Sequence, residues 1–154
     1  MKHSKVIFLL LFGALLVPWS LVAQSDNDMK AIKQVVKQYE DALNSNSLDG
    51  VVKIFTLDAV VLPPDAPAAS GHAAIREQYK AVTDPGTSIK ITLEIQELML
   101  SGDVAHVWSL NYGKIKFTGA DESSIDSKSL MVLQKTMDGW KAHRYMFNNN
   151  SQAD

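Results

Sequence analysis

The side chains best suited to acid–base or ligand-binding chemistry lie on two predicted strands in the C-terminal half of the chain. Side chains at every second position of a strand share one face. Two such faces each carry an imidazole and aromatic rings: His106, Trp108, Leu110 and Tyr112 on one strand, and His143, Tyr145 and Phe147 on the last. Imidazole titrates near neutral pH and can transfer a proton. Aromatic walls with a few polar groups are typical of small-molecule sites.

Three predicted helices come before these strands. Apolar residues at three- and four-residue spacing predict a first helix over about 28–44, with Asp26, Asn27 or Asp28 as its cap; they are Ile32, Val35, Val36, Tyr39 and Leu43. Ser47 is expected to cap a second, short helix. The third helix is predicted over about 72–83, with Tyr79 on its apolar side.

The other segments read as strands. A short strand over 59–62 stops at Pro63 and Pro64, which lack the N–H that a strand ladder needs. Alternation over 89–96 predicts a half-buried strand, and a slip in its phase predicts a bulge near Glu97. Further strands are predicted over 104–116, 127–136 and 140–147. Helices followed by long antiparallel strands indicate an α+β fold, with a curved sheet wrapped over the first helix.

Residues 1–23 have the layout of a secretory signal peptide. Lys2 and Lys5 precede an apolar run over 6–17, and Ala23 is the expected cleavage position. An uncleaved membrane anchor is the alternative, which the run disfavours because a membrane helix needs about 20 apolar residues. We expect a secreted or periplasmic protein whose single domain spans 24–154, with no membrane contact after cleavage.

Composition excludes several classes of protein. The formal net charge is −2 and the sequence has no cluster of Lys and Arg, which argues against nucleic acid and anionic membranes as partners. There is no cysteine, so disulfides and thiolate metal sites are excluded. The histidines are not at metal-ligand spacing, and no metal or other cofactor is predicted.

The chain resembles the nuclear transport factor 2-like superfamily, which includes ketosteroid isomerases and SnoaL-like polyketide cyclases. It is most similar to the small ketosteroid-isomerase-like and SgcJ/EcaC-type proteins. The matching motifs are Tyr39-x-x-Ala42-Leu43-Asn44, Leu48-Asp49-Gly50, Asp58-Ala59-Val60, Ser70-Gly71-x-x-Ala74-Ile75, and Gly139-Trp140 with Arg144-Tyr145-Met146-Phe147-Asn148. The resemblance implies a cone-shaped antiparallel sheet over three N-terminal helices, a fold also called cystatin-like.

The resemblance also implies roles for single residues. Tyr39 matches the isomerase tyrosine that donates to the substrate oxyanion. Pro63 stands where the isomerase has its general base. Ser129, Leu130 and Met131 stand near the position of its second donor, a protonated aspartate. A steroid-isomerase mechanism therefore lacks its base and one donor, and we reject that activity.

Two hypotheses remain for the site. In the first, both strand faces line a cavity beside Tyr39, which donates to a ligand oxygen while His106 or His143 transfers a proton. Trp108, Tyr112, Tyr145 and Phe147 would then contact a small, partly apolar organic ligand. In the second, Tyr39 and the two histidines are core or interface residues, and the protein is a non-catalytic binding or assembly module with a filled pocket.

The last strand also suggests a homodimer. Trp140, Ala142, Arg144 and Met146 are predicted on the face opposite to Tyr145. A sheet that is apolar on both faces needs a second cover, and a second copy of the chain across the outer sheet face would provide it. The alternative is that Trp140 packs locally against its hairpin.

Overall fold

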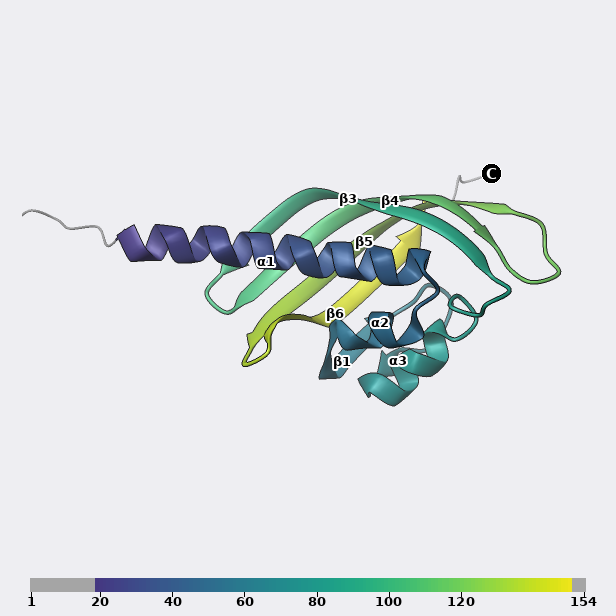
Figure 1. Cartoon of the computed structure of the whole chain (residues 1–154), viewed down its shortest axis with the longest axis horizontal. Coiled ribbons are helices and arrows are strands. Elements are labelled where there is room, and N and C mark those ends of the chain that lie inside the picture. Colours follow the sequence, from purple (N-terminus) through teal and green to yellow (C-terminus); the bar gives the residue numbers. More distant parts are fainter. Residues whose placement is uncertain (1–18, 151–154) are drawn as a thin grey trace, which may run out of the picture.

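The computed structural model describes residues 19–150 as three helices and one six-stranded sheet (Figure 1). In chain order the elements are α1 (Trp19–Asn44), α2 (Leu48–Lys53), β1 (Phe55–Leu62), β2 (Ala69–Ser70), α3 (Gly71–Tyr79), β3 (Ser88–Ser101), β4 (Val104–Lys116), β5 (Ser123–Thr136) and β6 (Gly139–Asn149). Among these residues, no helix is both long enough and apolar enough to cross a bilayer.

The sheet has the strand order β2-β1-β6-β5-β4-β3 and does not close into a barrel. β1 runs parallel to β6, and the other neighbours are antiparallel. The long helix α1 crosses one face of the sheet, and α2 and α3 pack at the β1 end (Figure 1). We call the face under α1 the inner face and the opposite one the outer face. The α+β cone predicted from the sequence is confirmed.

Helix α1 is longer than predicted. It begins at Trp19 rather than near residue 28, so Asp28 lies within the helix and does not cap it. Its carboxylate is buried and accepts from Trp140 Nε1 and Lys135 Nζ, both at 2.9 Å. These donors come from the β5–β6 hairpin and tie it to α1. Residues 1–18 of the predicted signal peptide lie outside the described residues, and cleavage after Ala23 stays a prediction.

The short elements differ from expectation mainly in their ends. Ser47 caps α2 as predicted, because its Oγ accepts from the Gly50 N–H at 3.1 Å. Phe55 begins β1, which is therefore longer at its start than the predicted 59–62 strand. Helix α3 ends at Tyr79, and the chain turns where the prediction continued the helix to residue 83.

Two bulges in the antiparallel part of the sheet set the faces of its long strands. The bulge predicted near Glu97 is confirmed, since the β3–β4 register shifts between Ile95 and Glu97. A second bulge lies at His143: Leu133 pairs with Ala142, and Val132 pairs with Arg144. The extra residue reverses the phase of β6.

The bulge at His143 corrects the predicted faces of β6. Trp140 and Ala142 lie on the inner face with Tyr145, not on the opposite one, and Trp140 is only 5% exposed. Arg144 and Met146 lie on the outer face, as predicted. Trp140 therefore packs inside its own chain and adds nothing to an outer interface.

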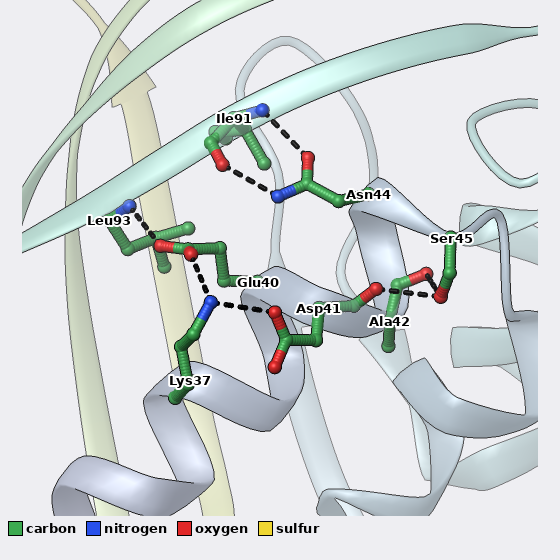
Figure 2. A network of polar contacts seen from close by, with 8 residues as sticks. All are labelled: Lys37, Glu40, Asp41, Ala42, Asn44, Ser45, Ile91 and Leu93. Carbon is green, nitrogen blue, oxygen red and sulfur yellow. Dashed lines mark hydrogen bonds and ion pairs between the residues drawn. The ribbon is translucent and has the colours of Figure 1, made fainter.

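The C-terminal turns of α1 bind the free edge of β3 (Figure 2). The Asn44 amide donates to the Ile91 carbonyl and accepts from the Ile91 N–H, both at 2.8 Å. The Glu40 carboxylate accepts from the Leu93 N–H at 2.8 Å. Lys37 donates to Glu40 and to Asp41 on its own helix. These bonds fix the position of α1 over the sheet.

Candidate functional site

Four aromatic rings from four elements meet inside the cone. Tyr39 of α1 stands edge-on to Tyr145 of β6, with ring centroids 5.2 Å apart, and to Tyr79 of α3 at 6.0 Å. Phe55 of β1 lies 6.3 Å from Tyr39. All four residues are at most 5% exposed. Edge-to-face rings of this kind pack favourably, so the cluster joins the helices to the sheet.

The tyrosines begin a chain of buried hydrogen bonds. The Tyr79 and Tyr39 hydroxyls are 2.7 Å apart and share a hydrogen bond. The Tyr145 hydroxyl lies beside those of Tyr39 and Ser129, near enough for each of them to influence its pKa. Ser129 Oγ donates to Asn111 Oδ1 at 3.2 Å, and Asn111 Nδ2 donates to Ser127 Oγ at 3.1 Å. We call this set the inner polar chain; its members are Tyr79, Tyr39, Tyr145, Ser129, Asn111 and Ser127.

The inner polar chain is uncharged at physiological pH. Burial raises the pKa of Tyr39 and of Tyr79 well above the usual value of a phenol, and it raises the pKa of Tyr145 as well. The other three members are amide or alcohol groups. The chain therefore offers hydrogen-bond donors and acceptors but no group that would remove a proton from a carbon acid.

One end of the inner polar chain adjoins half-buried apolar residues on the inner face. Phe147 stacks on Tyr145 with ring centroids 5.6 Å apart. Beyond Asn111 and Ser127, the inner face continues with half-buried side chains; they are Ile91, Ile115 and Ile125. The inner face thus passes from a polar centre to an apolar end.

Three of the predicted site residues lie on the wrong face for a site beside Tyr39. His106, Trp108 and Tyr112 do share one face of β4, but it is the outer face, and Trp108 is 42% exposed. Small and medium side chains occupy the inner face of β4 instead; they are Ala105, Val107, Ser109 and Asn111. His106 Nε2 lies 3.3 Å from Glu97 Oε1 on the neighbouring strand. The prediction that these three residues line a cavity with Tyr39 is wrong.

His143 has left the face of Tyr145 because it is the extra residue of the bulge. Its Nδ1 lies 3.1 Å from Thr56 Oγ1 and 3.6 Å from Asp58 Oδ1, both on β1. The Thr56 hydroxyl, with smaller contributions from His143 and Arg144, lowers the pKa of Asp58. His143 therefore belongs to a separate polar group on β1. Of the predicted site residues, Tyr39, Tyr145 and Phe147 are brought together.

The remaining members of the inner polar chain were missed as site residues. The sequence predicts Tyr79 only on the apolar side of a helix, and Ser129 only near a position that lacks a carboxylate. A signal for the others was present in the sequence. Polar residues at Asn111, Ser127 and Ser129 fall in phase with the buried apolar positions Val107 and Met131.

Two open grooves lie outside the inner polar chain. One, of about 590 Å³, runs between α1, α2 and the β5–β6 turn. The other, of about 860 Å³, lies beside the start of β1. Both are lined by Lys53, Asp138 and Lys141, and neither is lined by a member of the inner polar chain. Within residues 19–150, no three His, Asp or Glu side chains converge as they would around a metal ion.

Known proteins share this architecture. A family model described as the SnoaL-like domain matches residues 24–146. A ketosteroid isomerase-like protein from Erwinia carotovora atroseptica superposes with a TM-score of 0.75 at 25% identity, over 82% of this chain and 99% of that one. A candidate scytalone dehydratase from Novosphingobium aromaticivorans gives a TM-score of 0.71 at 19% identity, over 84% of this chain and 89% of that one. A nuclear transport factor 2-like protein with a cystatin-like fold, also from Novosphingobium aromaticivorans, gives 0.68 at 15% identity, over 90% and 92%. The predicted superfamily is confirmed.

Proposed function

Because the chain belongs to the SnoaL-like domain family, we propose that it binds a small, partly apolar organic molecule inside the cone. The observation that carries this proposal is the inner polar chain together with the apolar residues at its end. Burying a polar network carries a desolvation free energy that apolar side chains of similar shape would avoid. Its hydroxyl and amide groups match a ligand with a carbonyl or hydroxyl oxygen and an apolar body.

The proposed activity is binding rather than isomerisation. Pro63 directly follows the last residue of β1, where the isomerases carry their base. His106 and His143 do not join Tyr39, so neither imidazole is placed to perform the proton transfer considered from the sequence. The raised pKa of Tyr39 makes its hydroxyl a hydrogen-bond donor to a ligand oxygen, not a base.

A second candidate is a non-catalytic module with a filled interior. The observation in its favour is that the Tyr39 hydroxyl already bonds to the Tyr79 hydroxyl and is almost fully buried. In that case the aromatic cluster serves only as core. Function would then reside in assembly or in a protein partner, through the outer face of the sheet.

Native mass spectrometry of the protein, purified gently from its own host, separates the two candidates. We expect extra mass on the wild-type protein, lost in Phe147→Ala, which alters the apolar end of the inner face. The same mass should remain in Tyr112→Phe, because Tyr112 lies on the outer face. A ligand-free wild-type protein whose melting temperature no small ketone or phenol raises would contradict the proposal.

We also propose that the protein is exported and that two copies pair through the outer face. Export is supported by the basic start, the apolar run and Ala23 in the sequence. Fractionation of a Gram-negative expression host, with mass determination of the mature protein, tests it. The expected product is periplasmic and begins at Gln24, and a full-length cytoplasmic product would contradict export.

A further inference from the structure

A thioether, an imidazole, a carboxylate and an indole ring stand together on the outer face, on the last two strands of the sheet. Met99 of β3 is in register with His106 of β4, and Glu97 of β3 is in register with Trp108 of β4. Side chains in register share one face, with their Cβ atoms about 4.5–5.5 Å apart. We call these four residues the outer quartet.

The bulge in β3 creates the outer quartet. Ile91 and Ile95 point to the inner face, where both pack against the core, and regular alternation would send Glu97 inward after them. The register shift between Ile95 and Glu97 turns Glu97 and Met99 to the outer face instead. Bulges are frequent beside functional sites, because the extra residue redirects the side chains that follow. Without this bulge, neither the carboxylate nor the thioether would stand beside His106.

The imidazole and the carboxylate of the outer quartet have the spacing of two metal ligands. His106 Nε2 lies 3.3 Å from Glu97 Oε1. That separation exceeds the 2.7–2.9 Å that is usual, to about 0.1 Å, for a hydrogen bond between charged partners. Around a tetrahedral ion with bonds of about 2.0–2.1 Å, by contrast, two ligand atoms are separated by about 3.3–3.4 Å. A single ion can therefore bind both atoms without displacing either side chain.

The thioether determines which ion fits. Zinc takes thiolate, imidazole and carboxylate ligands, and calcium and magnesium take oxygen. Thioether sulfur is a soft ligand, and together with imidazole it favours Cu(I). The side chain of Met99 is unbranched and adaptable, so its Sδ can reach an ion held beside His106 in the paired position. The two described histidines outside the outer quartet, His72 and His143, have no methionine in register on a neighbouring strand.

The outer quartet is accessible from solvent. Met99 is 54% exposed, and the side chains of His106 and Glu97 are 42% and 52% exposed. The helices contact the sheet from its inner face (Figure 1). Trp108 is in register with Glu97 and lies on the same face as His106, so its ring flanks the ion position. The face of an indole ring attracts cations more strongly than that of any other aromatic side chain.

We propose that the outer quartet binds Cu(I), through His106 Nε2, Met99 Sδ and Glu97 Oε1, with the Trp108 ring beside the ion. This site goes beyond the proposed binding of an organic molecule inside the cone. It lies on the opposite face of the sheet from the inner polar chain and shares no residue with it. Each site can therefore be removed by substitutions that leave the other one intact.

Anaerobic titration of the purified protein with Cu(I) in dilute acetonitrile, followed by tryptophan fluorescence, tests this site. We expect saturable quenching that is lost in Trp108→Phe. Met99→Leu and His106→Gln keep the Trp108 ring and should each raise the dissociation constant by about 10-fold or more, since even the outer partners of metal ligands contribute that much. Met146→Leu is the matched control and should leave the constant unchanged, because Met146 is 41% exposed on the same face but lies on β6. Circular dichroism would show that every variant is folded.

The contrary outcomes are distinct. A wild-type protein without saturable quenching would overturn the site and leave His106 and Glu97 as a surface ion pair of little energetic weight. Equal constants for Met99→Leu and Met146→Leu would overturn the role of the thioether, and binding of Zn²⁺ as tight as that of Cu(I) would overturn the choice of ion. Sedimentation equilibrium tests the proposed pairing of two copies separately: a monomer that binds Cu(I) would support the metal site and contradict the pairing.

Discussion

The Tyr39 hydroxyl gives the sharpest test of the buried hydrogen-bond chain. Tyr39→Phe removes one oxygen atom and leaves the ring, so the aromatic contacts with Tyr145 and Tyr79 stay in place. The change deprives the buried Tyr79 hydroxyl of its partner and removes an oxygen beside the Tyr145 hydroxyl. The side chains involved are at most 5% exposed, so water does not readily replace the lost oxygen.

The expected cost follows from the loss of this bond and from the buried hydroxyl left without a partner. A typical hydrogen bond contributes about 1 kcal/mol net to stability, and a buried polar group left without a partner costs about 1–3 kcal/mol. For Tyr39→Phe we therefore expect a loss of about 2–3 kcal/mol in the free energy of unfolding. That is a large share of the roughly 5–15 kcal/mol by which most domains are stable.

Urea unfolding followed by circular dichroism measures this loss, at one protein concentration for all variants. Tyr112→Phe is the matched control, because it removes the same atom from a ring that is 42% exposed. Its effect should stay within about 0.5 kcal/mol. If Tyr39→Phe were as mild as Tyr112→Phe, the hydroxyls would not form the chain described above.

A double-mutant cycle adds a check on the 2.7 Å contact between the Tyr39 and Tyr79 hydroxyls. Each single Phe variant removes their shared hydrogen bond. The double variant should therefore cost less than the sum of the singles, by about 1 kcal/mol. Additive costs would show that the two hydroxyls do not bond to each other.

Three further predictions concern the same fold. The folded-state pKa values of the three buried tyrosines are raised, so the folded state keeps protons that the unfolded state releases above pH about 10. Their contribution to stability should be constant below that pH and then fall, by up to about 1.4 kcal/mol per pH unit for each tyrosine. The tyrosinate absorbance of these three residues should appear only on unfolding. Appearance of all the tyrosinate in the folded protein near pH 10 would refute this. Gly113→Ala should lower the free energy of unfolding, measured in urea, by about 2–4 kcal/mol, because a Cβ there would collide with the Lys90 carbonyl. A loss under about 1 kcal/mol would argue against so close an approach of the two strands. Asp28→Ala should lower the free energy of unfolding by about 2–4 kcal/mol, because Trp140 and the partly exposed Lys135 both lose their acceptor. Asp28→Asn should cost less, because the amide oxygen can still accept from Trp140. Equal costs of the two variants in thermal melts would contradict this.

The order of the elements could be predicted from the sequence because their signals are local. The apolar stripe of α1, the cap at Ser47 and the alternation in β3 depend on neighbours a few residues apart. The start of α1 could not be placed, because Asp28 reads as a helix cap until its distant partners are known. Those partners, Lys135 and Trp140, are more than a hundred residues away in sequence.

The faces of the late strands were harder to predict than the strands themselves. On β4, the large aromatic Trp108 points outward while the polar Asn111 points inward, so hydrophobicity alone selects the wrong face. On β6, the bulge at His143 reverses the alternation, and nothing in its local sequence marks it. Four of the seven predicted site residues were misplaced for these two reasons; they are His106, Trp108, Tyr112 and His143. Tyr39 was placed correctly because the helix stripe fixed its direction.

The two bonds from Asn44 to Ile91, with the bond from Glu40 to Leu93, have a consequence for solubility. β3 is the last strand of an open sheet, and its outward N–H and C=O groups could template another strand from a second molecule. The Asn44 side chain meets one donor and one acceptor of that edge in the way an added strand would. The end of α1 therefore blocks the addition of another strand at the β3 edge. Loss of Asn44 would expose β3 to fibril-like association even in a molecule whose interior is intact.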